Sequence, residues 1–345
     1  MVALPSPRSV SQNSKVHWLQ RHWSRITKLH LILYPISLVF RALVALRRDL
    51  YFSSFLPSHQ LLLPVIVVGN ISVGGTGKTP LTLALAQQLI ERGRLPLIVS
   101  RGYGRTSRRP QPVNTSSTAA QVGDEPLLMA HRDICPVWVG ADRFATAQAA
   151  LQANPQCDVV LCDDGLQHYR LQRDVEIAVI DAERGFGNGR MLPAGPLREP
   201  VSRLQTVDAV VVNGGEAGEG QYQMRLNGEI FHNLLSPDQT ATRADFNKPN
   251  VHAVAGIGHP QRFFQHLEKL GISFTPHAFP DHHPYRAIDL SFTDCDAILL
   301  TEKDAVKCAT FADARYWVLP VDAQIDPTLI DHILRKIDPH GHQTA

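Results

Sequence analysis

Apolar and polar positions follow two alternating periods after residue 61, which predicts strands and helices in turn. Residues 61–68 are almost continuously apolar, as is typical of a strand buried on both faces of a parallel sheet. Residues 78–92 then place leucines at 81, 85 and 89 on one side of a helix that Gly93 ends.

The same reading extends through residue 180. Further strands are expected at residues 95–100, 136–139, 159–162 and 176–180, and further helices at 124–132 and 142–153. This order predicts an α/β fold with a doubly wound, mostly parallel sheet and helices on both faces. Ligands of such sheets bind at the carboxyl ends of the strands.

The pattern changes after residue 212. Glycines dominate residues 214–220, and Asn227-Gly228 separates two short strand patterns, which predicts a two-residue hairpin. Further strands are expected at residues 251–255, 272–275, 297–300 and 316–319, and helices at 261–270 and 328–337. We therefore expect an N-terminal helix in residues 1–50, a phosphate-loop nucleotide-binding core in 51–214, and a smaller α/β subdomain in 215–345 that closes the cleft.

The overall composition excludes some classes of protein. Thirty-four basic residues nearly balance 32 acidic ones, so the chain has no global nucleic-acid footprint. The five cysteines have no paired spacing, which argues against a disulfide framework or a zinc site and fits a reducing compartment.

The N-terminal segment departs from this balance. Residues 15–48 contain seven Lys or Arg and no acid, and they enclose an apolar run at 29–46 that Arg41 interrupts. A membrane span needs ~20 apolar residues, so this run is too short. We expect a helix lying in the cytoplasmic face of a membrane. A helix packed on the domain, or one that mediates oligomerisation, is the alternative.

The strongest chemical signal is a glycine-rich turn between the first strand and the first helix. Such a turn directs backbone amides at phosphate oxygens. Lys78 would reach the β- and γ-phosphates, and Thr79 would bind Mg²⁺. The general pattern has glycine where this chain has Ser72, and Gly74 and Gly75 supply flexibility instead. The nucleotide-binding residues are Ser72, Val73, Gly74, Gly75, Thr76, Gly77, Lys78 and Thr79.

Two acids follow the strand at 159–162. Asp163 and Asp164 stand where nucleotide hydrolases hold Mg²⁺. In an extended chain these adjacent side chains would point to opposite sides. The structural alternative is that they cap the next element.

Asp124 begins a predicted helix and is a candidate base for accepting a hydroxyl proton. Its structural alternative is a helix N-cap. His282 and His283 follow Asp281, an arrangement suited to proton transfer and, less well, to a metal. Spacing alone does not decide between these roles.

A loop at residues 186–200 holds glycines, prolines and charges in a fixed arrangement. Arg198 is a candidate phosphate ligand, and Glu199 a candidate for the Mg²⁺ shell. A surface loop with incidental charges is the alternative. Residues 301–304 follow an apolar strand, and their spacing leaves open whether they line the cleft or tie the two lobes.

Together these motifs resemble the tetraacyldisaccharide 4′-kinase family of lipid A biosynthesis. The shared motifs are Val-Gly-Asn-Ile-Ser-Val-Gly-Gly-Thr-Gly-Lys-Thr at 68–79, Ser-Arg-Gly-Tyr-Gly-Arg at 100–105, Val-Gly-Asp-Glu-Pro at 122–126, Asp-Asp-Gly-Leu-Gln-His at 163–168, Phe-Gly-Asn-Gly-Arg-Met-Leu-Pro-Ala-Gly-Pro-Leu-Arg-Glu-Pro at 186–200, Asp-His-His at 281–283 and Thr-Glu-Lys-Asp at 301–304. These motifs occurring together in one order identify a family more specifically than the phosphate loop does alone. Ser72 matches what this family uses there.

The resemblance implies transfer of the ATP γ-phosphate, with Mg²⁺, to the 4′-hydroxyl of a tetraacyldisaccharide 1-phosphate, which gives lipid IV-A. It implies Asp124 as the catalytic base, supported by His282 rather than His283. Lys78 and Thr79 keep their phosphate-loop roles.

The same resemblance gives the remaining site residues and the setting. Asp163, Asp164 and Glu199 are candidates for the Mg²⁺ shell, and Arg101 and Arg198 for phosphate or substrate contacts. The implied enzyme is peripheral or monotopic on the cytoplasmic side of the inner membrane of a Gram-negative bacterium. Its partners are the acylated lipid and the membrane surface, with no nucleic acid and no obligate protein partner.

Two other functions compete with this one. A membrane-tethered nucleotide switch or ATPase would turn over ATP without an acceptor. The nearest approach to a guanine-specific motif, at residues 247–250, lacks its final aspartate, which argues against GTP. A soluble small-molecule kinase or ATP-dependent ligase is disfavoured by the basic apolar N-terminus.

Overall fold

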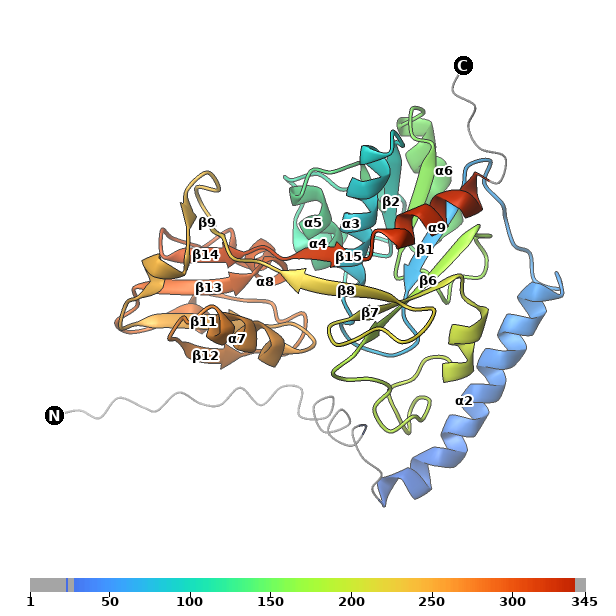
Figure 1. The fold of residues 1–345 in the computed structure, drawn as a ribbon, viewed down its shortest axis with the longest axis horizontal. Helices are drawn as coiled ribbons and strands as arrows, with labels where there is room; N and C mark the ends of the chain where they lie inside the picture. Colours follow the sequence, from blue (N-terminus) through green and yellow to red (C-terminus); the bar gives the residue numbers. More distant parts are fainter. Residues whose placement is uncertain (1–22, 24–27, 339–345) are drawn as a thin grey trace.

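The computed structural model describes residue 23 and residues 28–338. Two lobes, each built on its own sheet, lie side by side, and the long helix α2 (Leu29–Phe52) runs along the larger lobe on the side away from the smaller one (Figure 1). Both lobes alternate strands with helices, as the sequence predicts.

The larger lobe contains a nine-stranded sheet in the order β15-β8-β7-β6-β1-β5-β2-β4-β3. Its strands are β1 (Val65–Gly69), β2 (Pro96–Ser100), β3 (Gln111–Pro112), β4 (Val137–Val139), β5 (Val159–Asp163), β6 (Val175–Asp181), β7 (Ala209–Asn213), β8 (Tyr222–Asn227) and β15 (Asp322–Ile325). The strands from β4 to β8 run parallel, and β3 and β15 pair antiparallel at the two edges. Every residue of β1, β2 and β5 is buried, which explains their continuous apolar runs.

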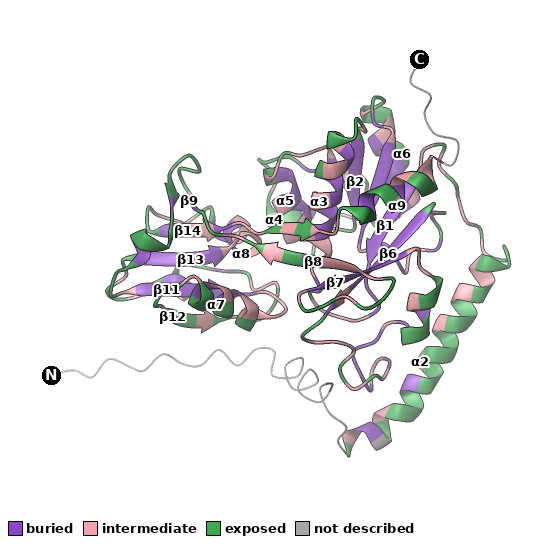
Figure 2. Ribbon diagram, viewed as in Figure 1, coloured by how far each residue is buried: buried purple, intermediate pink, exposed green. Residues whose placement is uncertain are grey.

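Helices cover both faces of this sheet and confirm the doubly wound fold. They are α3 (Lys78–Glu91), α4 (Ala119–Val122), α5 (Asp124–His131), α6 (Arg143–Ala153) and α9 (Thr328–Ile337). Leu81 and Leu85 of α3 and Ile330 of α9 belong to the core on one face. Ala147 and Ala150 of α6 belong to the core on the other. Figure 2 shows buried strands between partly exposed helices.

The smaller lobe has a six-stranded sheet in the order β10-β9-β14-β13-β11-β12. Its elements are β9 (Phe231–Asn233), β10 (Thr240–Ala241), β11 (Val251–Ala255), α7 (Pro260–Lys269), β12 (Thr275–Ala278), β13 (Ala297–Thr301), α8 (Glu302–Cys308) and β14 (Tyr316–Leu319), and the chain also forms short 3₁₀ turns at Val201–Thr206, Arg243–Phe246 and Ala287–Leu290. Phe263, Phe264 and Leu267 of α7 pack on this sheet.

The hairpin predicted at Asn227-Gly228 is wrong. β8 pairs with β7 and β15 in the larger sheet, whereas β9 pairs with β14 and β10 in the smaller one. The chain crosses between the lobes at this glycine, where an added Cβ would lie 2.2 Å from the Pro320 carbonyl oxygen of the returning strand connection. Glycine therefore permits two crossing segments to approach closely.

The division between the sheets also differs from the boundary predicted at residue 215. β8, β15 and α9 lie in the larger lobe, so the smaller sheet is formed by residues 231–319 alone. The chain enters the smaller lobe after β8 and leaves it before β15, and these two strands are neighbours in the larger sheet. The smaller lobe is therefore an insertion in the larger one.

Helix α2 packs on the larger lobe with only one side. Phe40 and Val44 contact the apolar cluster of Ile71, Met191 and Leu197. The opposite side is exposed, as the green face in Figure 2 shows, and carries Ile32, Ile36, Val39, Leu43 and Leu46. Among the described residues, no helix combines the length and apolarity needed to cross a membrane. The predicted basic positions before Lys28 lie outside the described residues.

A buried ionic network holds the loop after β6 to the strand. Arg203 is 1% exposed and donates to both carboxylate oxygens of Glu176, at 2.6 and 2.7 Å. Its Nε lies 3.8 Å from Glu199, which also accepts a hydrogen bond from Tyr169. Removing the cation would leave Glu176 with Arg173 as its remaining ionic partner, and Glu199 with only the neutral donors Tyr169 and Gln167.

We expect Arg203→Met to lower the free energy of unfolding by about 3–5 kcal/mol, since breaking a buried ion pair costs more than forming it gains. Urea denaturation measures the change. The matched control is Arg315→Met, which breaks an exposed pair with Asp313 and should cost less than about 1 kcal/mol. Equal losses in the two variants would contradict the assignment.

Candidate active site

The turn between β1 and α3 has the backbone of an anion-binding loop. Gly74 and Gly77 have φ of +99° and +95°, a region that disfavours other residues. An added Cβ at Gly77 would also lie 2.5 Å from the Asn213 side-chain nitrogen. Ser72 is absent from the positive-φ positions and forms a bridge with Leu197, so glycine is not required there.

Neighbouring segments brace the turn from both sides. The Asn70 side chain donates to the Thr76 hydroxyl at 3.2 Å, and the Asn213 side chain donates to the Thr76 carbonyl at 3.0 Å. The Val73 amide donates to the Pro196 carbonyl at 2.9 Å. The loop is therefore held in shape, and the first amides of α3 are left to bind an anion.

Asp163 ends β5 and is fully buried beside α3. One carboxylate oxygen accepts a hydrogen bond from Thr82 at 3.3 Å, and the other has no hydrogen-bond partner among the described residues. Burial, together with the charge of Glu125, raises the pKa of Asp163 to about 7 although Lys78 opposes the shift. A buried oxygen without a partner, close to the α3 N-terminus, fits a ligand of Mg²⁺, which prefers oxygen donors.

Asp164 turns the other way. Its φ of +48° departs from the extended chain, and its carboxylate lies 3.5 Å from Lys78 and 3.3 Å from Arg198. Burial raises the pKa of Asp164, but the charges of Lys78 and Arg198 outweigh it and lower the pKa to about 2. Of the two predicted metal acids, Asp164 therefore pairs with Lys78 of the phosphate loop, whereas Asp163 is buried against Thr82 of α3.

Asp124 is the first residue of α5, and Gly123 occupies the N-cap, so the capping alternative does not describe it. Its carboxylate lies 3.0 Å from Nδ1 of His282 in the other lobe. Burial raises the pKa of Asp124, but the hydrogen bond from His282 and the charges of Lys307, His282 and Lys303 lower it overall. The candidate base is therefore ionised at neutral pH.

The two adjacent histidines point to different carboxylates. His282 has φ of +60°, faces Asp124 and lies beside the Tyr103 ring, with ring centroids 5.0 Å apart. His283 lies 3.3 Å from Asp289. No cluster of three or more His, Cys, Asp or Glu side chains in the described part of the chain has the geometry to hold a metal. The geometry thus places His282, and not His283, beside Asp124.

Ion pairs join the two lobes at the same place. Lys303 of α8 lies 2.9 Å from Glu125 and 3.1 Å from Asp281, and Glu302 lies 2.6 Å from Arg132. Residues 301–304, whose role the spacing left open, therefore tie the lobes. Lys307, one turn further on, also faces Asp124; the four-residue spacing of the two lysines was a signal that sequence reasoning missed.

A cavity of about 740 Å³ lies between the lobes. The larger lobe contributes the phosphate loop with Lys78 and Thr79, and the smaller lobe contributes Gly258, Arg262 and Lys303. Its size suits a nucleotide-sized ligand. The phosphate loop and the contact between Glu125 and Lys303 thus line one space.

The remaining predicted residues have other surroundings. Glu199 is 1% exposed, and its carboxylate accepts hydrogen bonds from Tyr169 and Gln167. Arg101 is exposed, and its charge helps to lower the pKa of His168, after burial and the charge of Arg143. Glu199 therefore has its acceptors engaged by protein donors, unlike Asp163.

The chain resembles known proteins over most of its length. Residues 29–338 match a family model described as tetraacyldisaccharide-1-P 4′-kinase. Proteins named tetraacyldisaccharide 4′-kinase include one from Methylobacillus flagellatus, 49% identical over 93% of this chain and 96% of the relative. Another, from Dechloromonas aromatica, is 48% identical over 95% and 99%. A crystal structure described as the "apo" form of LpxK from Aquifex aeolicus in complex with ATP is 30% identical, with a TM-score of 0.74 over 90% of this chain and 99% of that one.

If Asp163 is a metal ligand, its raised pKa predicts that metal binding depends on pH. The protonated Asp163 carboxyl cannot bind a cation, so below pH 7 it must lose a proton before the metal binds. The affinity for the metal should therefore fall as pH decreases from 8 to 6. We expect the affinity to fall by roughly tenfold over this interval, with Mn²⁺ as a paramagnetic probe of the nucleotide-free protein. Asp163→Asn should bind weakly and without this pH dependence. Equal wild-type affinities at both pH values would contradict the assignment.

Proposed function

The chain belongs to the tetraacyldisaccharide 4′-kinase family, and from this premise we propose how its residues move the ATP γ-phosphate to the 4′-hydroxyl of a tetraacyldisaccharide 1-phosphate. The observation that carries the proposal is the 3.0 Å contact between Asp124 and His282, made across the lobes. It supplies an ionised, oriented base next to a phosphate-binding loop.

The phosphate loop binds the nucleotide. The amides of residues 74–79 and the N-terminus of α3 face the phosphate oxygens, and Lys78 neutralises charge on the β- and γ-phosphates. Thr79, Asp163 and Asp164 would hold Mg²⁺, which when bound offsets the negative charge that develops on the transferred group. We leave Glu199 out of this set, because it is 1% exposed and Tyr169 and Gln167 occupy its oxygens. The Asp164 side chain, in contrast, is 30% exposed and lies beside Lys78 of the loop.

Asp124 accepts the proton of the acceptor. The hydroxyl oxygen forms a bond to the γ-phosphorus, the bond from that phosphorus to the β–γ bridging oxygen breaks, and ADP leaves. The hydroxyl proton passes to Asp124, which is ionised beforehand because His282 and nearby lysines lower its pKa. His282 fixes the direction of the carboxylate, and Arg101 and Arg198 are proposed to meet the phosphates or the substrate.

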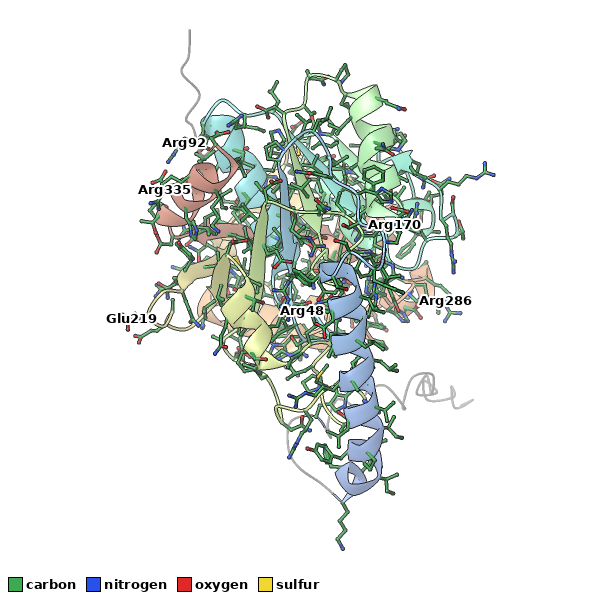
Figure 3. The ribbon with its side chains drawn as sticks, turned by 90° about the vertical axis from the view of Figure 1, so that its right-hand side faces the viewer. Arg48, Arg92, Arg170, Glu219, Arg286 and Arg335 are labelled. Carbon is green, nitrogen blue, oxygen red and sulfur yellow. The ribbon has the colours of Figure 1, made fainter. Side chains whose placement is uncertain are left out.

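The acceptor also sets where the protein works. Its acyl chains stay in a bilayer because each buried CH₂ is worth about 0.8 kcal/mol. The exposed apolar side of α2 matches such an interface, and Arg41, Arg47 and Arg48 on the same helix favour anionic lipid. Figure 3 shows α2 extending past the core, with Arg48 toward the end nearer the core. We propose that α2 lies in the cytoplasmic leaflet of the inner membrane.

Replacing the base tests the reaction. We expect Asp124→Asn to lower kcat by roughly 10²- to 10⁴-fold, because the hydroxyl proton loses its acceptor. ATP affinity should stay within about twofold, since Asp124 does not belong to the phosphate loop. Mass spectrometry of the acceptor measures the added phosphate, and calorimetry measures ATP binding. Strongly weakened ATP binding would assign Asp124 to the nucleotide site instead.

Charging the exposed side of α2 tests the membrane proposal. Ile36→Asp combined with Leu43→Asp should abolish most sedimentation with vesicles that contain anionic lipid, because both side chains are more than half exposed. ATP affinity should not change. Ile288→Asp, at a still more exposed position in the smaller lobe, is the control and should sediment like wild type. Normal vesicle binding by the α2 variant would refute the proposal.

A further inference from the structure

Helix α8 brings two lysines to the contact between the lobes, and they lie in different environments. Lys303 lines the cavity between the lobes. Lys307 lies one turn deeper, and its side chain is 6% exposed. A lysine buried to this extent carries a desolvation cost that only close partners offset.

The first partner of Lys307 is Asp304 on the same helix. Asp304 is fully buried, and one of its oxygens lies 2.9 Å from the Lys307 ammonium. Its other oxygen accepts hydrogen bonds from the Gly256 amide at 2.9 Å and from the Thr301 hydroxyl at 2.7 Å. Asp304 is therefore fixed by the end of β11 and by the start of its own helix, and its remaining oxygen forms an ion pair with the lysine.

The second partner is in the other lobe. The Lys307 ammonium lies 3.8 Å from the Asp124 oxygen that also receives the His282 hydrogen bond. It stands 5.0 Å from the centre of the Tyr285 ring, whose face attracts a cation. Buried ion pairs add little stability compared with apolar packing, so stability alone does not explain this arrangement.

We propose that Lys307, anchored by Asp304, is a positioning residue of the phosphoryl transfer: it holds the Asp124 carboxylate in place beside His282. The inference rests on the proposed role of Asp124 as base. Without the lysine, Asp124 and Asp304 lose the cation that both carboxylates approach, and the repulsion between them grows. Like charges in one site drive one of them to take up a proton.

The charges around Asp124 indicate that Lys307 keeps the pKa of this carboxyl low. His282, from the loop after β12, and Lys307, from α8, lie against Asp124, and the charge of Lys303 also acts on it. The acids nearby are paired with these cations: Asp281 with His282 and Lys303, Glu125 with Lys303, and Asp304 with Lys307. Among these, the Lys307 charge follows the His282 hydrogen bond in lowering the pKa of Asp124 against the effect of burial. Removing it should raise the pKa of the base.

The test uses the full-length protein, Mg-ATP and the acceptor in detergent. Lys307→Met should lower kcat by roughly tenfold or more, with the KM for ATP within about twofold. The acid limb of the pH–kcat profile should rise by about one pH unit. Lys307→Arg, which keeps the charge, should retain most of the activity. Lys336→Met, which breaks an exposed pair with Asp208, is the matched control and should behave like wild type.

A double variant separates positioning from a general structural role. In the Asp124→Asn background, Lys307→Met should cost less than about twofold further, because the lysine acts through Asp124. Full activity of Lys307→Met, or losses that multiply in the double variant, would overturn the inference.

Two controls keep the test decisive. If Lys307→Met fails to fold, Asp304→Asn provides the test. This variant should lower kcat without shifting the acid limb of the pH–kcat profile to higher pH. An unchanged kcat would refute the role of Asp304 in positioning Lys307. A wild-type protein that adds no phosphate to the acceptor would instead refute the proposed function.

Discussion

The structure depends on the charged contact between α5 of the larger lobe and the loop and helix of the smaller lobe that face it. Asp124 meets His282, Glu125 meets Lys303 and Arg132 meets Glu302. A phosphate loop alone binds a nucleotide but gives no preference for a sugar hydroxyl. The contact places Asp124, the proposed base, on the same side of the larger lobe as the loop, and it exists only when both lobes are folded and adjacent.

Several residues of the site adopt conformations or environments that destabilise the fold, and burial of apolar strands elsewhere offsets this loss of stability. Asp164 and His282 have left-handed backbone, and Gly74 and Gly77 adopt turns that other residues disfavour. One buried oxygen of Asp163 has no hydrogen-bond partner in the described part of the chain. The surrounding sheets offset these costs through β1, β2 and β5, which are buried at every position. A site with fixed groups needs little rearrangement when substrate binds.

Local sequence patterns predicted the parts of the site that one strand–turn–helix unit contains. β1, the phosphate loop and α3 follow from apolar runs and glycine spacing, and the acids at the end of β5 from strand polarity. The contact of Asp124 with His282 spans 158 positions, so no periodicity reports it, and the capping alternative stayed open until the fold joined them. The resemblance to a family, rather than the spacing, selected His282.

Two predictions failed for the same physical reason. The dipeptide at 227–228 has the composition of a tight turn, but its glycine serves a close crossing of two chains between the sheets. The boundary at 215 followed the glycine-rich loop, whereas strand pairing returns β8 and β15 to the larger sheet. Composition reports local flexibility, and strand partners are chosen by packing over the whole chain.

In the proposed reaction, nucleotide, metal and acceptor meet between the lobes, with Asp124 at the reacting hydroxyl. The most direct measurement is a crystal structure with Mg²⁺, a non-hydrolysable ATP analogue and the acceptor. We expect the γ-phosphate on the loop at residues 74–79 and the 4′-oxygen within hydrogen-bond distance of Asp124. A 4′-oxygen placed against any other carboxylate, or a triphosphate bound away from Lys78, would contradict the account.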